Sequence, residues 1–281
     1  MYRIRFFVGR LVQFRLVLLL LGGILFNCSG LLAADNDHYV LVFSDEFDGP
    51  NGSQPDAAKW SRPWRNPSQW ARWISNSADV VYVRRGKLVC RAIPNRKEPA
   101  DTATMLTGAV ETRGKFSFQY GKVEVRMRTN LRQGNFPAAW MKAEDRYNAV
   151  RYGEIDIVET YGYEGKSAHT LHTHRSYTLK KEGIQREFKK VVDVTKWHVY
   201  GVEWTRDAIV WTVDGEKVGE YLRQSSPQMV AEGQWTFDCP FYIRLNQSVG
   251  NGNNPLMVPK VNKVYETQFD WIRVYQKTQE D

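Results

Sequence analysis

Alternation of apolar and polar side chains constrains the fold of this chain more than any other feature. It runs through residues 122–128, 197–204 and 269–276. A period of two is typical of half-buried β-strands, because successive side chains of a strand point to opposite faces. Many short strands separated by turns indicate one β-sandwich or barrel over residues 35–281, rather than two domains.

Turn and helix signals agree with an all-β chain. Residues 208–213 alternate, and the following Asp214-Gly215 favours a tight hairpin turn before a further strand at 216–221. Helical patterns are confined to short pieces near residues 97–103 and 223–231. Aromatic residues make up 13% of the chain, which leaves rings to line a groove once a core is built. A large sandwich with one concave face suits an extended polymer.

The N-terminal segment is set apart from this fold. Four arginines, the last of them Arg15, precede an apolar run at residues 16–26. That run is shorter than the ~20 residues of a membrane-spanning helix, and a basic start with a short apolar core is typical of a secretory signal peptide. Residues 1–34 are therefore predicted to be a signal peptide, with its cleavage position undetermined. Cys28 stands where a lipoprotein carries its lipid, so the predicted locations are periplasmic, extracellular or outer-membrane.

The charge does not indicate a nucleic-acid-binding protein. The whole chain carries +8, but residues 1–34 contribute four arginines and no acid, so the remainder carries +4. Nucleic-acid binding requires basic residues gathered on one element, and those of this chain are scattered. We expect a monomer without a nucleic-acid partner, which touches a membrane only through a lipid on Cys28.

Cys90 and Cys239 lie in apolar, strand-like segments at residues 87–92 and 237–243. In an oxidising compartment they could form a disulfide. Burial as two small apolar side chains fits the same sequence, so the pairing stays open.

Three carboxylates, Glu154, Asp156 and Glu159, fall within six residues of an otherwise apolar segment. On a regular strand Glu154 and Asp156 share one face, and Glu159 points to the other. A β-bulge near Ile157 and Val158 returns Glu159 to the first face, because a bulge sets two residues opposite one of the neighbouring strand. The spacing therefore predicts a bulged strand with three acids facing one cleft.

Such a cluster suits retaining glycoside hydrolysis, in which a nucleophilic carboxylate and an acid/base carboxyl lie ~5–5.5 Å apart. Crowded like charges cannot all ionise, so one carboxyl keeps a proton that it can donate. A solvated acidic edge strand and a divalent-metal site are the alternatives. The apolar Ile155, Ile157 and Val158 argue against a surface strand. Calcium would need more oxygen ligands, and zinc would need His or Cys nearby.

Further motifs, in their order, resemble glycoside hydrolase family 16, the laminarinase, lichenase and agarase group. Residues 43–47 (FSDEF), 120–126 (YGKVEVR) and 134–141 (GNFPAAWM) match landmarks before the acid strand. Residues 170–172, 198–204 and 270–275 match landmarks after it. The resemblance runs from about residue 40 to 277. It implies a β-jelly-roll sandwich of two antiparallel sheets with a concave substrate cleft.

The resemblance also implies roles for single residues. Glu154 corresponds to the nucleophile, Asp156 to the assisting acid and Glu159 to the general acid/base, in the bulged form of the family. No cofactor or metal is implied for catalysis. Substrate contacts are expected from Trp140, Tyr152, His172, Asn246 and Gln247, although a core position for Trp140 and a structural role for His172 stay open.

These motifs do not fix the sugar. Many glucan-active members carry Trp where this chain has Phe136, and another Trp where it has residues 150–152. We expect an endo-acting hydrolase of β-1,3 or mixed β-1,3/1,4-glucan. The alternatives are an endo-β-galactosidase of agar-like, porphyran-like or mucin-type O-glycans, and a non-catalytic carbohydrate-binding sandwich, against which the three acids argue. Asp270 is a candidate ligand of a structural calcium that the family resemblance suggests near the two termini.

Overall fold

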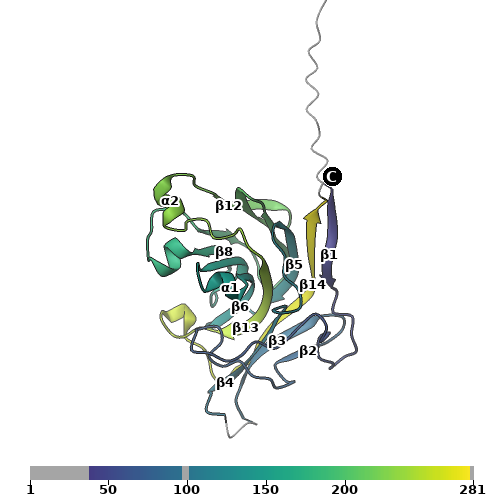
Figure 1. The fold of residues 1–281 in the computed structure, drawn as a ribbon. Helices are drawn as coiled ribbons and strands as arrows, with labels where there is room; N and C mark the ends of the chain where they lie inside the picture. The colour runs from purple at the N-terminus through teal and green to yellow at the C-terminus, as the bar shows by residue number, and fades with distance from the viewer. Residues whose placement is uncertain (1–37, 97–100, 279–281) are drawn as a thin grey trace, which may run out of the picture. The chain divides into compact units, whose positions relative to one another are not determined.

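The computed structural model describes residues 38–96 and 101–278, and these form an all-β fold (Figure 1). The predicted sandwich of antiparallel sheets is confirmed, with one addition. Strands β3 (Leu88–Pro94) and β4 (Met105–Glu111) pair with each other and join the two layers into one continuous sheet. The predicted signal peptide at 1–34, with Cys28, lies outside the described residues. Within the described residues no helix is long and apolar enough to cross a membrane.

The strand order follows two layers. One contains, in spatial order, β12 (Glu216–Leu222), β11 (Ala208–Val213), β10 (His198–Trp204), β5 (Gly121–Thr129), β14 (Tyr265–Lys277) and β3. The other contains β4, β13 (Phe241–Val249), β6 (Asn135–Ala143), β7 (Gly153–Glu159), β8 (Lys166–Thr173) and β9 (Glu187–Val191). Two short additions are β1 (Tyr39–Asp45), which pairs with β14, and β2 (Val81–Val83), which pairs with β3.

The two ends of this strand order approach each other. Phe188 of β9 lies so close to Gly219 of β12 that a Cβ at position 219 would come within 2.2 Å of the Phe188 ring. The curved sheet therefore nearly closes into a barrel, and glycine at 219 is what allows the approach.

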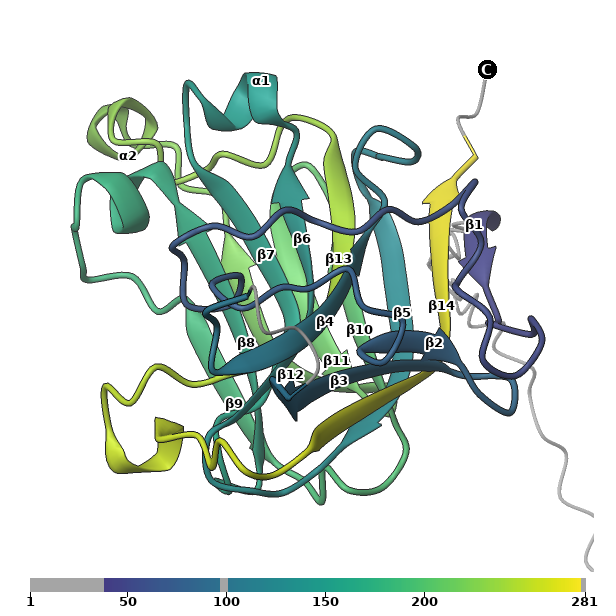
Figure 2. The same ribbon diagram turned by 90° about the horizontal axis from the view of Figure 1, so that it is seen from below.

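The core lies between the two layers, whose strands are seen from below in Figure 2. Val125 of β5 points into it, while the charged residues on either side of Val125 point outward. From the opposite layer, Met141 and Leu245 reach the same core. Because side chains alternate along a strand, their neighbours Trp140 and Asn246 face the other side of the sheet. This side carries the cleft described below.

The local predictions are mostly confirmed. Asp214 and Gly215 both have positive φ, 52° and 82°, as a tight hairpin turn requires. The helical piece expected at 223–231 contains α2 (Pro227–Ala231). The other expected piece is wrong in its described part, because residues 101–103 are not helical and 97–100 lie outside the described residues. The structure adds three short helices that the sequence did not indicate, namely α1 (Asp145–Asn148), the π-helix η1 (His174–Thr178) and the 3-10 turn η2 (Pro255–Met257).

Side-chain contacts decide two further points. Cys90 and Cys239 are both buried and unpaired, so the disulfide that the sequence left open is not formed. The carboxylate of Asp270 lies 3.0 Å from Nζ of Lys87 and pairs also with Arg126. Two cations already neutralise this carboxylate, so Asp270 does not fit its predicted role as a calcium ligand.

Candidate active site

The acidic segment forms β7, and this strand carries the predicted bulge. Between Asp156 and Glu159, three steps along β7 match only two along β8. Ile157 and Val158 both point into the core with 0% exposure. The additional buried residue turns Glu159 back to the side of Glu154 and Asp156, as the spacing of the acids predicted.

Two carbonyl groups at the bulge have partners from other elements. Nε1 of Trp211, on β11 of the opposite layer, donates to the Asp156 carbonyl at 2.9 Å. Nδ1 of His169 lies 2.7 Å from the Ile157 carbonyl, and its Nε2 lies 3.0 Å from the Ser167 hydroxyl. Burial lowers the pKa of His169 to about 4, so the ring is neutral and donates its proton to Ile157. The bulge is thus held by side chains that do not face the cleft.

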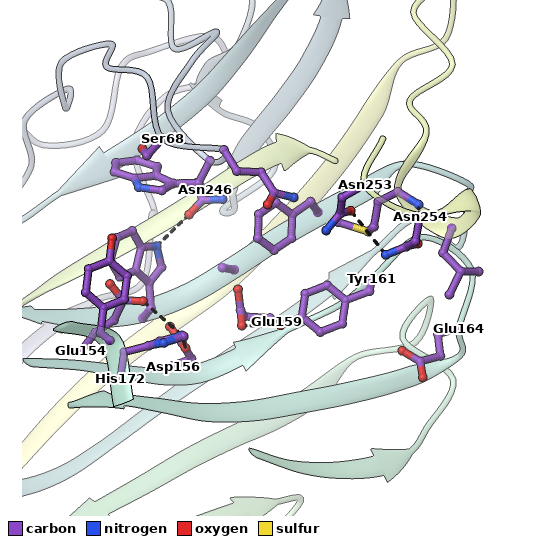
Figure 3. Close-up of a pocket in the computed structure, with 18 of the residues that line it drawn as sticks. Ser68, Glu154, Asp156, Glu159, Tyr161, Glu164, His172, Asn246, Asn253 and Asn254 are labelled. Atoms are coloured by element: carbon purple, nitrogen blue, oxygen red, sulfur yellow. Dashed lines mark hydrogen bonds and ion pairs between the residues drawn. The ribbon is translucent and has the colours of Figure 1, made fainter. Parts of the chain in front are cut away.

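All three acids line a cleft of about 720 Å³ (Figure 3). Its floor comes from β6, β7, β8 and β13, and its walls come from residues 68–70, the π-helix η1 and residues 253–257. Aromatic rings with a few polar groups between them are the usual lining of a ligand site. The rings here are Trp70, Phe136, Trp140, Tyr152, Tyr161 and Tyr177.

Glu154 is surrounded by donors and positive charge. The Tyr152 hydroxyl donates to Oε2 of Glu154 at 2.6 Å, and Nζ of Lys142 lies 3.4 Å from the same oxygen. Nε2 of His172 lies 3.6 Å from Oε1. These contacts place hydrogen-bond donors and positive charge around both oxygens of Glu154, an arrangement that suits a nucleophilic role.

Glu159 has a different environment. The Tyr161 hydroxyl donates to its Oε2 at 2.6 Å, and the Tyr161 ring stacks on Phe136 with centroids 5.7 Å apart. Burial and the neighbouring charge of Asp156 raise the pKa of Glu159 well above its ordinary value, against the smaller opposing effect of Tyr161. A carboxyl group that keeps its proton near neutral pH is suited to act as an acid.

Asp156 and His172 lie next to Glu154. Asp156 is 3% exposed, and its Oδ2 lies 3.4 Å from Nε2 of His172. Burial and the charge of Glu154 raise the pKa of Asp156 to about 6. Burial disfavours a charged His172, but Asp156, Glu154 and Glu159 outweigh it and raise the pKa of this imidazole to about 9. His172 and Lys142 therefore supply two positive charges, which balance the three carboxyl groups when one of these holds a proton.

Trp140 and Asn246 are fixed to each other at the base of the cleft. Nε1 of Trp140 donates to Oδ1 of Asn246 at 2.8 Å, and the Asn246 amide donates to Oγ of Ser248 at 3.1 Å. The Trp140 ring meets Trp70 edge-on at 5.0 Å, and the Arg244 guanidinium lies 4.7 Å from the Trp140 ring centroid. Trp140 and Asn246 both line the cleft with little exposure, 4% and 1%, so the surface they offer to a ligand is small and rigid.

Comparison with known proteins explains this arrangement. A family model described as glycosyl hydrolases family 16 matches residues 72–271. The chain belongs to glycosyl hydrolase family 16. The predicted family is thereby confirmed, and members of this family need no cofactor for catalysis.

Characterised relatives of this family 16 hydrolase differ in substrate. The chain is 32% identical to the keratan-sulfate endo-1,4-beta-galactosidase of Sphingobacterium multivorum, over 84% of this chain and 55% of that protein. It is 31% identical to the beta-glucanase of Rhodothermus marinus, over 90% of this chain and 91% of that protein. The chain thus spans about half the length of the first relative and most of the second.

Solved structures show the same fold. SCLam, a non-specific endo-beta-1,3(4)-glucanase from family 16, has a TM-score of 0.74 at 28% identity, over 86% of this chain and 92% of SCLam. A structure described under endo-acting O-glycanases of the human gut microbiota that initiate mucin breakdown has a TM-score of 0.72 at 30% identity. It covers 85% of this chain and is itself covered completely, at 100%.

The site of this family 16 hydrolase does not include Gln247. The Gln247 side chain is fully buried, donates to Asn135 at 2.8 Å and accepts from Thr267 at 2.6 Å. Gln247 follows Asn246 on a strand, so alternation places it on the core side of the sheet. Its predicted substrate contact is therefore wrong. The other four residues predicted to contact substrate, Trp140, Tyr152, His172 and Asn246, line the cleft.

One group of side chains in the described residues has the spacing of a metal site. Ligand atoms of Glu154, Asp156 and His172 lie within 4.8 Å of one another. A charged His172 offers no free lone pair at Nε2, and Lys142 and Tyr152 already contact Oε2 of Glu154. The group therefore fits shared protons better than a divalent cation.

Lys142, Tyr161 and Tyr177, which surround the acids and their partners, are among the side chains of the site that were not predicted. Tyr161 stands two residues after Glu159, so the period of a strand was a usable signal for it. Lys142 faces Glu154 across the β6–β7 pair, a register that depends on the loop between these strands. Tyr177 belongs to a π-helix, whose position has no sequence signal.

Proposed function

We propose that this family 16 hydrolase cleaves internal β-glycosidic bonds with retention of configuration, through two displacements that use Glu154 and Glu159. The observation that carries the proposal is the bulged β7, which brings both glutamates to one cleft in unlike surroundings. Retaining hydrolysis needs two carboxyl groups in different protonation states. The contacts of Tyr152 and Lys142 suit Glu154 to attack, whereas burial and the charge of Asp156 favour a proton on Glu159.

The reaction follows from these two states. In the first step, Glu154 attacks the anomeric carbon while Glu159 gives its proton to the departing glycosidic oxygen, so one chain end leaves and a glycosyl-enzyme ester forms. In the second step, Glu159 takes a proton from water, and the water oxygen displaces Glu154 from the anomeric carbon. Asp156 and the charged His172 limit the build-up of negative charge beside Glu154.

The polymer we propose first is a β-1,3 or mixed β-1,3/1,4-glucan. Support comes from the beta-glucanase of Rhodothermus marinus, of which the chain covers 91%. A further similar structure, a SCLam variant with a TM-score of 0.71, presents a 1,3-beta-D-cellobiosyl-glucose at its active site.

The second candidate is a galactose-containing polymer, such as keratan sulfate, a mucin-type O-glycan or an agar- or porphyran-like galactan. Phe136 and residues 150–152, which include Tyr152, stand where tryptophans are expected in a glucanase. The Phe136 and Tyr152 side chains are both aromatic. Their rings stack on tyrosines of the chain itself, Phe136 on Tyr161 at 5.7 Å and Tyr152 on Tyr177 at 3.7 Å. A ring that is covered on one face by a neighbour offers less surface to a glucose residue.

A polymer panel tests both the reaction and the sugar. Laminarin, barley β-glucan, agarose, porphyran, keratan sulfate and mucin O-glycans are incubated with the protein, and the products are sized and followed by proton NMR. We expect oligosaccharides early in the reaction, with the β-anomer formed first. A first-formed α-anomer would contradict retention, and galactan cleavage without glucan cleavage would select the second polymer class.

We also propose that the protein acts as an exported monomer. Support comes from the signal-like segment 1–34 and from Cys28 in it. Fractionation of cells that express the full chain or its Cys28→Ala variant tests this. Release of the Cys28→Ala variant from a membrane fraction that retains the unmodified chain would indicate a lipid anchor.

A further inference from the structure

We propose that Lys142 is a positioning residue for Glu154. Lys142 and Tyr152 both bind one oxygen of the Glu154 carboxylate and fix its position. The other oxygen of Glu154 is then the one that attacks. This inference rests on the nucleophilic role proposed for Glu154, and it adds a residue outside the acid strand to the reaction.

The location of Lys142 supports a role on Glu154 rather than on substrate. Lys142 on β6 pairs in register with Glu154 on β7, and its Nζ lies 3.4 Å from Oε2. The Lys142 side chain is 13% exposed and is not part of the cleft lining. The Tyr152 ring covers the ammonium, with 3.5 Å between Nζ and the ring centroid. The positive charge is therefore enclosed between a carboxylate and an aromatic face.

A buried ammonium is costly unless it is paired. Among the described residues, Glu154 is the acid that Lys142 contacts within ion-pair distance. Burial also lowers the pKa of Lys142, and the charge of Glu154 opposes this effect. Ionisable side chains whose pKa is shifted by burial and by a specific charged partner are common at functional sites.

The other catalytic carboxyl group provides an internal control. Tyr161 donates to Glu159 at 2.6 Å, as Tyr152 donates to Glu154 at 2.6 Å. A lysine also lies over the Tyr161 ring, Lys189 at 5.7 Å, but it pairs with Glu164 at 3.7 Å and Glu187 at 3.3 Å. The two tyrosine–glutamate pairs are alike, and Glu154 differs from Glu159 in its contacts with Lys142 and His172.

Charged and titratable groups face Glu154 from several elements. These are Lys142 on β6, Tyr152, Asp156 and Glu159 on or beside β7, and His172 on β8; Tyr177 on η1 acts on Tyr152, and Arg244 on β13 acts on Lys142. Arg244 already pairs with Glu111 at 2.7 Å. Without Lys142, His172 is the remaining cation beside three carboxyl groups. The carboxyl groups then hold more unbalanced negative charge, so protonation of the cluster persists to higher pH.

The test compares Lys142→Met and Lys142→Arg with the unmodified protein in the pH dependence of kcat and KM. The substrate is laminarin, or keratan sulfate if the polymer panel selects it. The acid limb is the low-pH side of the kcat profile, and we expect Lys142→Met to move it upward by about one pH unit. This is the lower end of the pKa shift that an opposite charge at such a distance causes. KM should change little. Lys142→Arg should keep the limb close to its original position. Lys122→Met is the matched control, because Lys122 pairs with Glu124 at 2.7 Å on the opposite layer.

Two outcomes would overturn the inference. If Lys142→Met raises KM and leaves the acid limb unshifted, Lys142 contacts substrate instead of positioning Glu154. If Lys122→Met shifts the acid limb by the same amount, the effect comes from the net charge of the protein. If Lys142→Met does not fold, the pH dependence of kcat is measured for Tyr152→Phe instead. This variant keeps the ring over Lys142 and removes the hydroxyl that donates to Glu154. A smaller shift in the same direction supports the inference, and no shift contradicts it.

Failure of the proposed function gives a separate signal. If azide does not restore turnover to Glu154→Gly, then Glu154 is not the nucleophile and the proposed reaction fails. If azide restores turnover while the Lys142→Met limb does not move, the inference about Lys142 alone fails.

Discussion

Glu154 and Glu159 are the same side chain on the same strand, and they differ in what surrounds them. Both accept a tyrosine hydroxyl at 2.6 Å, from Tyr152 and Tyr161 respectively. Near Glu154 the site also has Lys142 and the charged His172, whereas Glu159 lies beside the Phe136–Tyr161 stack and has a raised pKa. One carboxyl group is thereby suited to attack and the other to proton donation.

The comparison shows how a single strand can supply two opposite chemical roles. The bulge brings both glutamates to the same side, and the neighbouring strands then differentiate them by charge. Changes at either end of β7 should therefore affect different steps of the reaction.

The largest loss of activity is expected from a change at the Glu154 end of β7, where Lys142 and His172 supply positive charge. Glu154→Gly should lower hydrolysis by roughly four orders of magnitude or more, because it removes the nucleophile of the first step. With an activated aryl β-glycoside, added azide should enter the vacated space and give an α-glycosyl azide, detectable by NMR. A product azide of β-configuration would show that Glu154 does not occupy the nucleophile's side of the sugar.

A smaller loss of activity, whose size depends on the leaving group of the substrate, is expected from a change at the Glu159 end of β7. Glu159→Ala should slow polysaccharide hydrolysis by roughly 10²–10⁴-fold, the range for one general acid. An activated aryl glycoside leaves without a proton, so its glycosylation step should be much less affected. Comparable losses in kcat/KM for both substrates would remove Glu159 from the acid role and make the two ends functionally alike.

His172 tests the charge near Glu154 without removing a glutamate. His172→Asn should lower kcat by about 10–10²-fold, the value of a lost contact between charged groups. The pKa of His172 is raised to about 9 in the folded protein, so its contribution to stability is full below the unfolded value and is lost as pH rises towards 9. The difference in Tm between the unmodified protein and the variant should therefore shrink between pH 6 and pH 9.5.

His198→Asn is the control for this measurement. His198 also contacts a carboxylate, Asp214 at 2.7 Å, but lies outside the cleft. A kcat loss of the same size in His198→Asn would mean that the effect of His172 is not specific to the site.

The features of this site that were predicted from the sequence are those that follow from the alternation of side chains along a single strand. The odd spacing between Asp156 and Glu159 was sufficient for the bulge, because strand parity is a local property. The same parity argument, applied to Asn246 and Gln247, would have assigned them to opposite faces. Both were instead carried over from the family resemblance, and Gln247 was placed wrongly.

Other features depend on how separate strands meet. The contact of Lys142 with Glu154 requires the β6–β7 register, and the joining of the two layers requires β3 to pair with β4. Register is set by loop geometry and by the packing of the whole sheet. No pattern within one segment contains that information, so these features appeared only in the structure.

Tyr161→Phe is the smallest change that sharpens the comparison. It keeps the ring that stacks on Phe136 and removes the hydroxyl that donates to Glu159. The hydroxyl lowers the pKa of Glu159 against the larger effects of burial and Asp156, so its loss raises that pKa further. The acid then keeps its proton to higher pH, and the basic limb of kcat should move upward by about half a pH unit to one unit.

The acid limb should stay in place in Tyr161→Phe, because Glu154 keeps Lys142 and Tyr152. Tyr163→Phe, at an exposed tyrosine two residues further along, is the matched control. A shift of the acid limb in Tyr161→Phe would mean that the two carboxyl groups titrate as one unit, and that the distinct surroundings of Glu154 and Glu159 do not separate their roles.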